Sequence, residues 1–137
     1  MGRSFTIPRL SGDKEALKIC LSNIFKNATQ HTFGGEIKIV TLYDETKCEL
    51  HVAVMDTGTG IAKNKLENLK SGNLGQIKRS IETGSGAGLG FFVSRKLISI
   101  YDGKLEIKSH CFNQSTVVKF SMQFNQVKDE EIDEEED

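Results

Sequence analysis

Apolar residues recur at helical spacing along residues 14–31, which predicts the first long helix of the chain. Ser11 or Asp13 can cap its start, because either side chain accepts a hydrogen bond from the first unpaired backbone amides. Asn23 and Asn27 stand one turn apart at the edge of the apolar face, so we expect two amides where the core meets a cleft. The apolar positions are Ala16, Leu17, Cys20, Leu21, Ile24, Phe25 and Ala28.

The rest of the pattern predicts one more long helix and four strands. The helix runs from Gly88 to Gly103, where glycine is a natural stop. Its helically spaced apolar positions are Leu89, Phe92, Val93, Leu97, Ile100 and Tyr101. Alternation predicts strands over residues 36–43, 49–55, 104–109 and 116–124, with the first two forming a hairpin. This order indicates an α/β protein, more closely an α+β two-layer sandwich with helices covering one face of a mixed sheet.

Two segments lack this regular pattern. Residues 62–83 are rich in lysine and glycine and contain no aromatic residue, so we expect a short helix within a mobile lid. Residues 128–137 hold eight acids and one lysine, which is typical of a solvated segment. We assign one domain to residues 5–125 and an acidic disordered tail or linker to residues 126–137.

Composition narrows the partners and the compartment. The net charge of -1 gives no reason to expect nucleic acid as a partner. Cys20, Cys48 and Cys111 are odd in number and far apart, so neither a disulfide framework nor a zinc site is indicated, and a reducing, cytoplasmic compartment is the simplest interpretation. No apolar stretch approaches the roughly 20 residues that cross a bilayer, so we expect no direct membrane contact by this chain.

Three polar or glycine-rich features stand at the ends of the predicted elements. They are the Asn23/Asn27 pair, the run DTGTGI from Asp56 to Ile61, and the glycine-rich run from Gly84 to Gly90. Each alone is more often a cap, a turn or a hinge than a binding site. The phosphate-loop motif G-x-x-x-x-G-K-[ST] is absent, and the Gly84–Gly90 run breaks the dinucleotide spacing G-x-G-x-x-G.

Together these features resemble the nucleotide-binding superfamily shared by gyrase, heat-shock chaperones, MutL and histidine kinases, with its Bergerat-type fold. LKICLSNIFKNATQHT is similar to the asparagine box of the histidine kinases, DTGTGI to their first glycine box, and GAGLGFFVSRKLISIYDGKLEIKS to their second box. The resemblance runs from about Gly12 to Met122 and implies that the chain binds ATP with Mg2+.

The resemblance also implies site residues, and their chemistry suits the roles. Asn27 is the expected Mg2+ ligand, because an amide oxygen is a hard, neutral donor. Asp56 is expected to accept a hydrogen bond from the amine of adenine, which disfavours guanine at the same edge. The backbone amides of the glycine-rich run before the second helix are expected to donate hydrogen bonds to the phosphates. The expected nucleotide-binding set is Asn23, Asn27, Asp56, Gly58, Gly60, Ile61, Lys78, Arg79, Gly86, Gly88, Leu89, Gly90 and Thr116.

Asn23 favours a kinase over an ATPase. The ATP-hydrolysing members of the superfamily carry a water-activating glutamate at this position, whereas a histidine nucleophile needs no such base. Asn23 and Asn27 are thus the expected catalytic residues. The resemblance implies transfer of the γ-phosphoryl group to a histidine on a separate dimerisation domain, and a response-regulator receiver downstream. His31, His51 and His110 lie outside the family's phosphoacceptor pattern, and we expect all three to be structural.

Some positions depart from the family pattern and keep other interpretations open. Gln30 replaces a basic residue that contacts phosphate, a phenylalanine-rich segment between the glycine boxes is missing, and the family's first helix is expected before Phe5. One alternative is an ATPase, or an ATP-sensing module without phosphotransfer. Another is a retroviral-type aspartic protease, because VAVMDTGTG matches an apolar strand that ends in Asp-Thr-Gly at Asp56.

Overall fold

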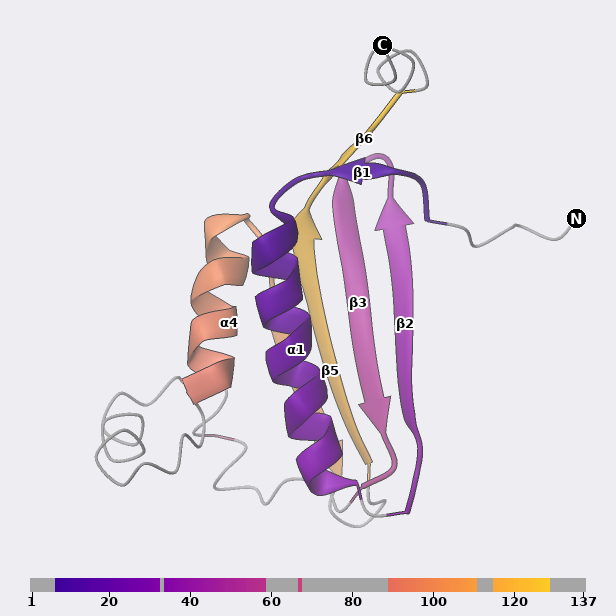
Figure 1. Ribbon diagram of the computed structural model, residues 1–137, viewed down its shortest axis with the longest axis vertical. Coiled ribbons are helices and arrows are strands. Elements are labelled where there is room, and N and C mark those ends of the chain that lie inside the picture. The colour runs from indigo at the N-terminus through magenta and orange to yellow at the C-terminus, as the bar shows by residue number, and fades with distance from the viewer. Residues whose placement is uncertain (1–6, 33, 59–66, 68–88, 111–114, 129–137) are drawn as a thin grey trace, which may run out of the picture.

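In the part of the chain that the structure describes, the fold has two layers, a four-stranded sheet and a pair of helices that pack side by side against it (Figure 1). The structure, a computed structural model, describes residues 7–32, 34–58, 67, 89–110 and 115–128. The strands of the sheet are β2 (Ile37–Asp44), β3 (Glu49–Asp56), β4 (Leu105–His110) and β5 (Ser115–Gln123). The helices are α1 (Lys14–His31) and α4 (Leu89–Ile100). The predicted α+β two-layer arrangement is confirmed.

The order of strands across the sheet is β2-β3-β5-β4, and each neighbouring pair runs antiparallel. The expectation of a mixed sheet is therefore wrong for the described strands. Alternation along a strand says which face is buried but carries no information on the direction of its neighbour. The register pairs Ile37 with Asp56 and Asp56 with Thr116.

Both helices have well-defined ends. Asp13 caps α1, since its Oδ1 accepts a hydrogen bond from the backbone N of Ala16 at 2.9 Å. Beyond Ile100 the backbone N of Gly103 donates to the carbonyl of Ile98 at 2.9 Å, and Asp102 has a positive φ of 54°. This is a Schellman-type stop in which an aspartate, not the predicted glycine, adopts the left-handed conformation.

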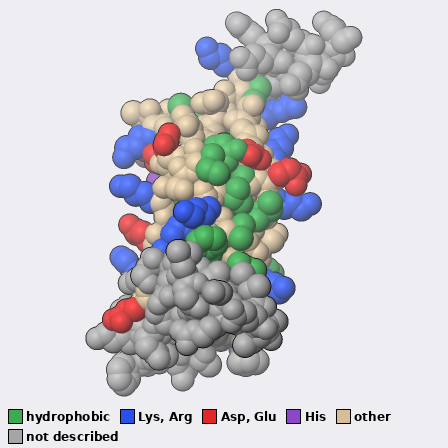
Figure 2. All heavy atoms as spheres, turned by 90° about the vertical axis from the view of Figure 1, so that its left-hand side faces the viewer, with side chains coloured by type: hydrophobic (Ala, Val, Ile, Leu, Met, Phe, Trp, Pro, Cys, Tyr) green, Lys and Arg blue, Asp and Glu red, His purple; other side chains and the backbone are tan. Residues whose placement is uncertain are grey.

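The face that α4 buries differs from the predicted one. Phe91, Ser94 and Ile98 are its buried residues, whereas Val93 is 37% and Ile100 68% exposed. The helix is apolar on most sides, so spacing alone did not identify the buried face. Figure 2 views the molecule from the side on which α4 lies and shows hydrophobic side chains gathered among charged ones.

A short two-stranded sheet joins the two ends of the described chain. Strands β1 (Leu10–Ser11) and β6 (Asn125–Gln126) pair antiparallel, and the backbone N of Val127 donates to the carbonyl of Arg9 at 2.8 Å. Two-residue strands are too short to leave an alternation in the sequence, so the sequence did not predict them.

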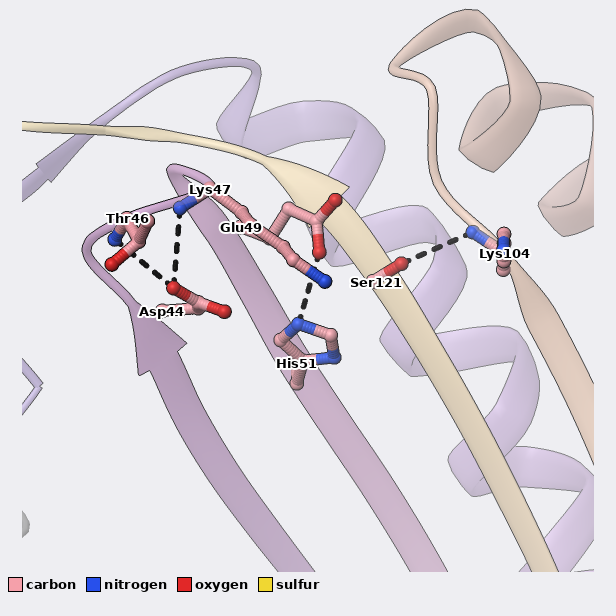
Figure 3. Close-up of polar contacts among 7 residues, drawn as sticks. All are labelled: Asp44, Thr46, Lys47, Glu49, His51, Lys104 and Ser121. Atoms are coloured by element: carbon pink, nitrogen blue, oxygen red, sulfur yellow. Dashed lines mark hydrogen bonds and ion pairs between the residues drawn. The ribbon is translucent and has the colours of Figure 1, made fainter.

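The hydrophobic core lies between the helices and one face of the sheet. It includes Ala16, Cys20, Ile24 and Ala28 of α1, Leu50, Val52 and Val54 of β3, and Val118, Phe120 and Met122 of β5. The opposite face carries polar contacts, shown in Figure 3. There His51 Nε2 lies 3.1 Å from Glu49 Oε2, and Ser121 Oγ accepts a hydrogen bond from the backbone N of Lys104 at 3.1 Å.

Candidate nucleotide site

Asp56, the last residue of β3, supplies the carboxylate of the predicted site and is buried, with 5% of its surface exposed. Its Oδ1 accepts a hydrogen bond from the backbone N of Gly58 at 2.9 Å, which turns the chain sharply after the strand. Thr116 lies directly opposite Asp56 in the β3–β5 register and is 2% exposed. Asp56 and Thr116, two of the predicted nucleotide-binding residues, are therefore neighbours on the helix-covered face.

Ser109 of β4 completes this group, and the sequence did not single it out. Its Oγ lies 2.8 Å from Oγ1 of Thr116 and 3.3 Å from the carbonyl of Ser115, to which it donates. Its place follows from the β4–β5 register, which pairs Ser109 with Thr116. A lone serine in an alternating strand does not indicate such a role in the sequence. The role becomes visible only when the strand register is known.

Thr57 anchors the turn that follows β3. Its backbone N donates to the carbonyl of Glu36 at 3.1 Å, and its hydroxyl accepts from the backbone N of Glu36 at 2.9 Å. A Cβ on Gly35 would collide with that hydroxyl. The start of β2 is thus fastened to the end of β3, which fixes the direction in which Asp56 and Gly58 enter the site.

Asn23 joins α1 to α4. Its Nδ2 lies 3.3 Å from the carbonyl oxygen of Gly90 and 3.3 Å from Oγ of Ser94. The thiol of Cys20, one turn earlier, donates to the carbonyl of Ser94 at 3.7 Å. Burial raises the pKa of the Cys20 thiol, so it stays protonated. Asn27 lies one turn beyond Asn23 and is half-buried.

Figure 1 shows that these parts meet at one end of the molecule. The C-terminal half of α1, the end of β3, the start of β5 and the start of α4 all lie there. The described members of the predicted set are therefore gathered at that end; they are Asn23, Asn27, Asp56, Gly58, Leu89, Gly90 and Thr116. Gly60, Ile61, Lys78, Arg79, Gly86, Gly88 and the predicted lid, apart from Glu67, lie outside the described residues.

A hollow among the described residues lies elsewhere. It measures about 600 Å3 and lies on the uncovered face of the sheet, where its lining includes Leu42, His51, Lys104 and Lys119. None of the predicted site residues lines it. The candidate site is instead the place where Asp56, Thr116 and the asparagines converge, whereas the hollow is lined by surface charges of both signs, among them Glu49, Lys104 and Glu106.

Comparison with known proteins identifies the family. The family model described as histidine kinase-, DNA gyrase B- and HSP90-like ATPase matches residues 12–126, most of the chain. The chain belongs to this ATPase family. The resemblance inferred from the three boxes is confirmed. The aspartic protease alternative is wrong, because that fold is nearly all strand, whereas this one contains helices of 18 and 12 residues.

Relatives within the ATPase family include sensor kinases. The adaptive-response sensory kinase SasA of Microcystis aeruginosa is 32% identical over 104 residues, which are 75% of this chain and 26% of SasA. The sensor protein EvgS of Escherichia coli is 30% identical, over 72% of this chain and 8% of EvgS. The hybrid signal transduction protein dokA of Dictyostelium discoideum is 32% identical, over 80% of this chain and 7% of dokA. The chain thus spans about a quarter or less of these relatives.

Solved structures of the ATPase family share the fold. Full-length ShkA in complex with AMPPNP superposes with a TM-score of 0.67 at 21% identity, over 88% of this chain and 24% of ShkA. The catalytic domain of the histidine kinase ThkA gives 0.61 at 24% identity, over 82% of this chain and 67% of that chain. No helix in the described part of the chain is long and apolar enough to span a membrane.

Proposed function

We propose that this chain is the ATP-binding catalytic domain of a histidine kinase. It binds ATP with Mg2+ and transfers the γ-phosphoryl group to a histidine on a separate dimerisation domain, which in turn supplies a response-regulator receiver. The observation that carries the proposal is the gathering of Asp56, Thr116, Asn23 and Asn27 at one end of a fold of the ATPase family. The free thiols of Cys20 and Cys48 suit a reducing, cytoplasmic compartment.

Base selection rests on Asp56. One carboxylate oxygen is held by the Gly58 amide, and a carboxylate has about four lone-pair sites, so it keeps acceptor capacity for a ligand. The exocyclic amine of adenine supplies the matching donor. Guanine presents a carbonyl oxygen at the same edge and would place two acceptors together.

Phosphate and metal binding rest on the helices. Asn27 offers a neutral amide oxygen from α1, the kind of ligand Mg2+ takes alongside phosphate oxygens and water. The first amides of a helix such as α4 have no partner within the helix, and together with the positive end of the helix dipole they suit phosphates. Mg2+ would neutralise charge on the transferring phosphoryl group. The described residues contain no cluster of three His, Cys, Asp or Glu side chains that could hold a metal ion by itself.

Calorimetry with ATP and GTP tests the proposal. Wild-type protein should bind ATP and prefer it over GTP. Asp56→Asn should weaken ATP binding by roughly 10- to 100-fold, because a lost hydrogen bond to a charged group costs about 1.5–3 kcal/mol.

Asp44→Asn is the matched control. Asp44 also accepts turn amides, from Thr46 at 3.0 Å and Lys47 at 3.1 Å, but it lies at the far end of β2 (Figure 3). Its substitution should leave ATP affinity unchanged. Equal affinity for ATP and GTP, or full ATP binding by Asp56→Asn, would remove Asp56 from base recognition.

A further inference from the structure

We propose that Ser94 is a positioning residue that orients the Asn23 amide, so that Asn23 meets the bound nucleotide and its metal only through its carbonyl oxygen. This inference rests on the proposed function, because it concerns the same nucleotide site. Ser94 lies on α4, within the segment that resembles the second box, but it is not among the predicted site residues. It is 0% exposed, although serine is usually found at protein surfaces.

The orientation of Asn23 follows from its partners. The carbonyl oxygen of Gly90 only accepts hydrogen bonds, so the Asn23 atom 3.3 Å away must be the amide nitrogen. That nitrogen has a second hydrogen, and Ser94 Oγ accepts it, also at 3.3 Å. Both donors of Asn23 are therefore directed into α4.

One hydrogen-bonding group of Asn23 remains for a ligand, its carbonyl oxygen. An oxygen accepts from water, including water bound to a cation, and it repels phosphate oxygens. Asn23 is half-buried, so this oxygen belongs to a side chain that is only partly covered. The structure thus assigns Asn23 and Asn27 the same chemistry, two amide oxygens one helical turn apart.

Ser94 is what maintains this orientation. Without its hydroxyl the amide keeps one partner on α4, and rotation of the side chain would bring the nitrogen toward the ligand. Gly90 lies close to the same side chain, since a Cβ added there would be in van der Waals contact with Asn23, 3.4 Å from its Cβ and Cγ. The hydrogen bond between Asn23 and Ser94 thus links α1, which carries both asparagines, to α4, whose start faces the phosphates in the proposed complex.

A double-mutant cycle on the full chain tests the assignment. ATP affinity in the presence of Mg2+ is measured by calorimetry for wild type, Ser94→Ala, Asn23→Ala and the double variant. Ser94→Ala should weaken binding by roughly 2- to 10-fold, the effect of one neutral hydrogen bond. Asn23→Ala should cost clearly less in the Ser94→Ala background than in wild type, because the two side chains act as a unit.

Controls separate positioning from folding. Ser99→Ala is the matched variant, because Ser99 is exposed on the same helix and its hydroxyl donates to the Lys96 carbonyl at 2.8 Å. It should bind ATP as wild type does. Ser94→Cys is a second variant that fills nearly the same volume as serine, in case Ser94→Ala does not fold. It should also weaken ATP binding, because a thiol is a poor hydrogen-bond acceptor.

Two results would overturn the inference: unchanged affinity in folded Ser94→Ala or Ser94→Cys, or losses from Ser94→Ala and Asn23→Ala that simply add. Wild-type protein that fails to bind ATP would instead overturn the proposed function, so the two failures are distinguishable.

Discussion

Asp13 shows how one side chain ties two helices together. Its Oδ1 caps α1 through the Ala16 amide at 2.9 Å, and its Oδ2 accepts a hydrogen bond from the hydroxyl of Tyr101, just beyond α4. The Tyr101 bond, followed by the Ala16 bond, lowers the pKa of Asp13 from 3.8, and the same contact with Asp13 raises the pKa of Tyr101 from 10.0.

These shifts predict a pH window for the stabilising effect of Tyr101. A lowered carboxyl pKa gives stability that is present above pH 3.8 and is lost as the pH falls through the folded-state pKa, below that value. A raised phenol pKa gives stability that is present below pH 10.0 and is lost as the pH rises through the folded-state pKa, above it. Tyr101→Phe should therefore lower the free energy of unfolding at neutral pH, and this loss should shrink below pH 3.8.

Urea unfolding across a pH series measures the effect, with Tyr43→Phe as the control. The Tyr43 hydroxyl donates to the backbone carbonyl of Phe124 at 2.8 Å, which does not titrate in acid. Its contribution should stay constant between neutral and acid pH. A Tyr101→Phe loss that is equally constant would contradict the assigned Asp13 contact.

At the scale of elements, the turn between α4 and β4 depends on a close approach. A Cβ on Gly103 would run into the carbonyl oxygen of Ser121 on β5, whereas Asp102 carries the left-handed φ of 54°. Lys104 and Ser121 exchange hydrogen bonds beside it, at 3.0 and 3.1 Å.

Gly103→Ala should therefore destabilise the fold by about 2–3 kcal/mol or more, as expected for overpacking against rigid backbone. Asp102→Gly is the paired variant, and it should be neutral or stabilising by up to about 1 kcal/mol because glycine adopts positive φ at little cost. Thermal unfolding compares the two. Similar midpoints for Gly103→Ala and wild type would show that β5 moves away without penalty.

What the sequence could reveal depended on whether a feature is local. The periodicity of α1 predicted both of its ends, and the ends of the four main strands differ from the predicted ones by at most one residue. Long-range features were missed. The bond between Asn23 and Ser94 and the contact of Ser109 with Thr116 depend on helix packing and strand register, which no local pattern encodes.

For the whole molecule, the gathering of the site residues at one end determines where a phosphate acceptor must approach. His51 lies on the uncovered face of the sheet beside Glu49, and the described site residues lie at one end of the helix-covered face. In-line transfer requires the acceptor to approach the γ-phosphate at that end.

We expect the isolated chain to bind ATP but to acquire no phosphate, and to phosphorylate a histidine when the dimerisation domain of its parent protein is added. It should also hydrolyse ATP slowly, because an amide at position 23 lacks the roughly 10²–10⁴-fold help of a general base. Labelled ATP, with and without the added domain, measures both. Acid-labile label on the isolated chain would contradict the need for a separate acceptor domain, whereas fast hydrolysis abolished by Asn23→Ala would place the protein among the ATP-hydrolysing members.

The thiol of Cys20 can be used to measure how often the contact between α1 and α4 opens. The thiol is 0% exposed between α1 and α4, and burial raises its pKa, so an alkylating reagent can reach a reactive thiolate only after the helices separate. Its rate of modification therefore reports the free energy of local opening at the contact where Asn23 meets Ser94. Any ligand that binds across both helices slows that reaction by the factor by which it suppresses opening, so nucleotide binding can be followed as a longer lifetime of the free thiol, with no label on the nucleotide.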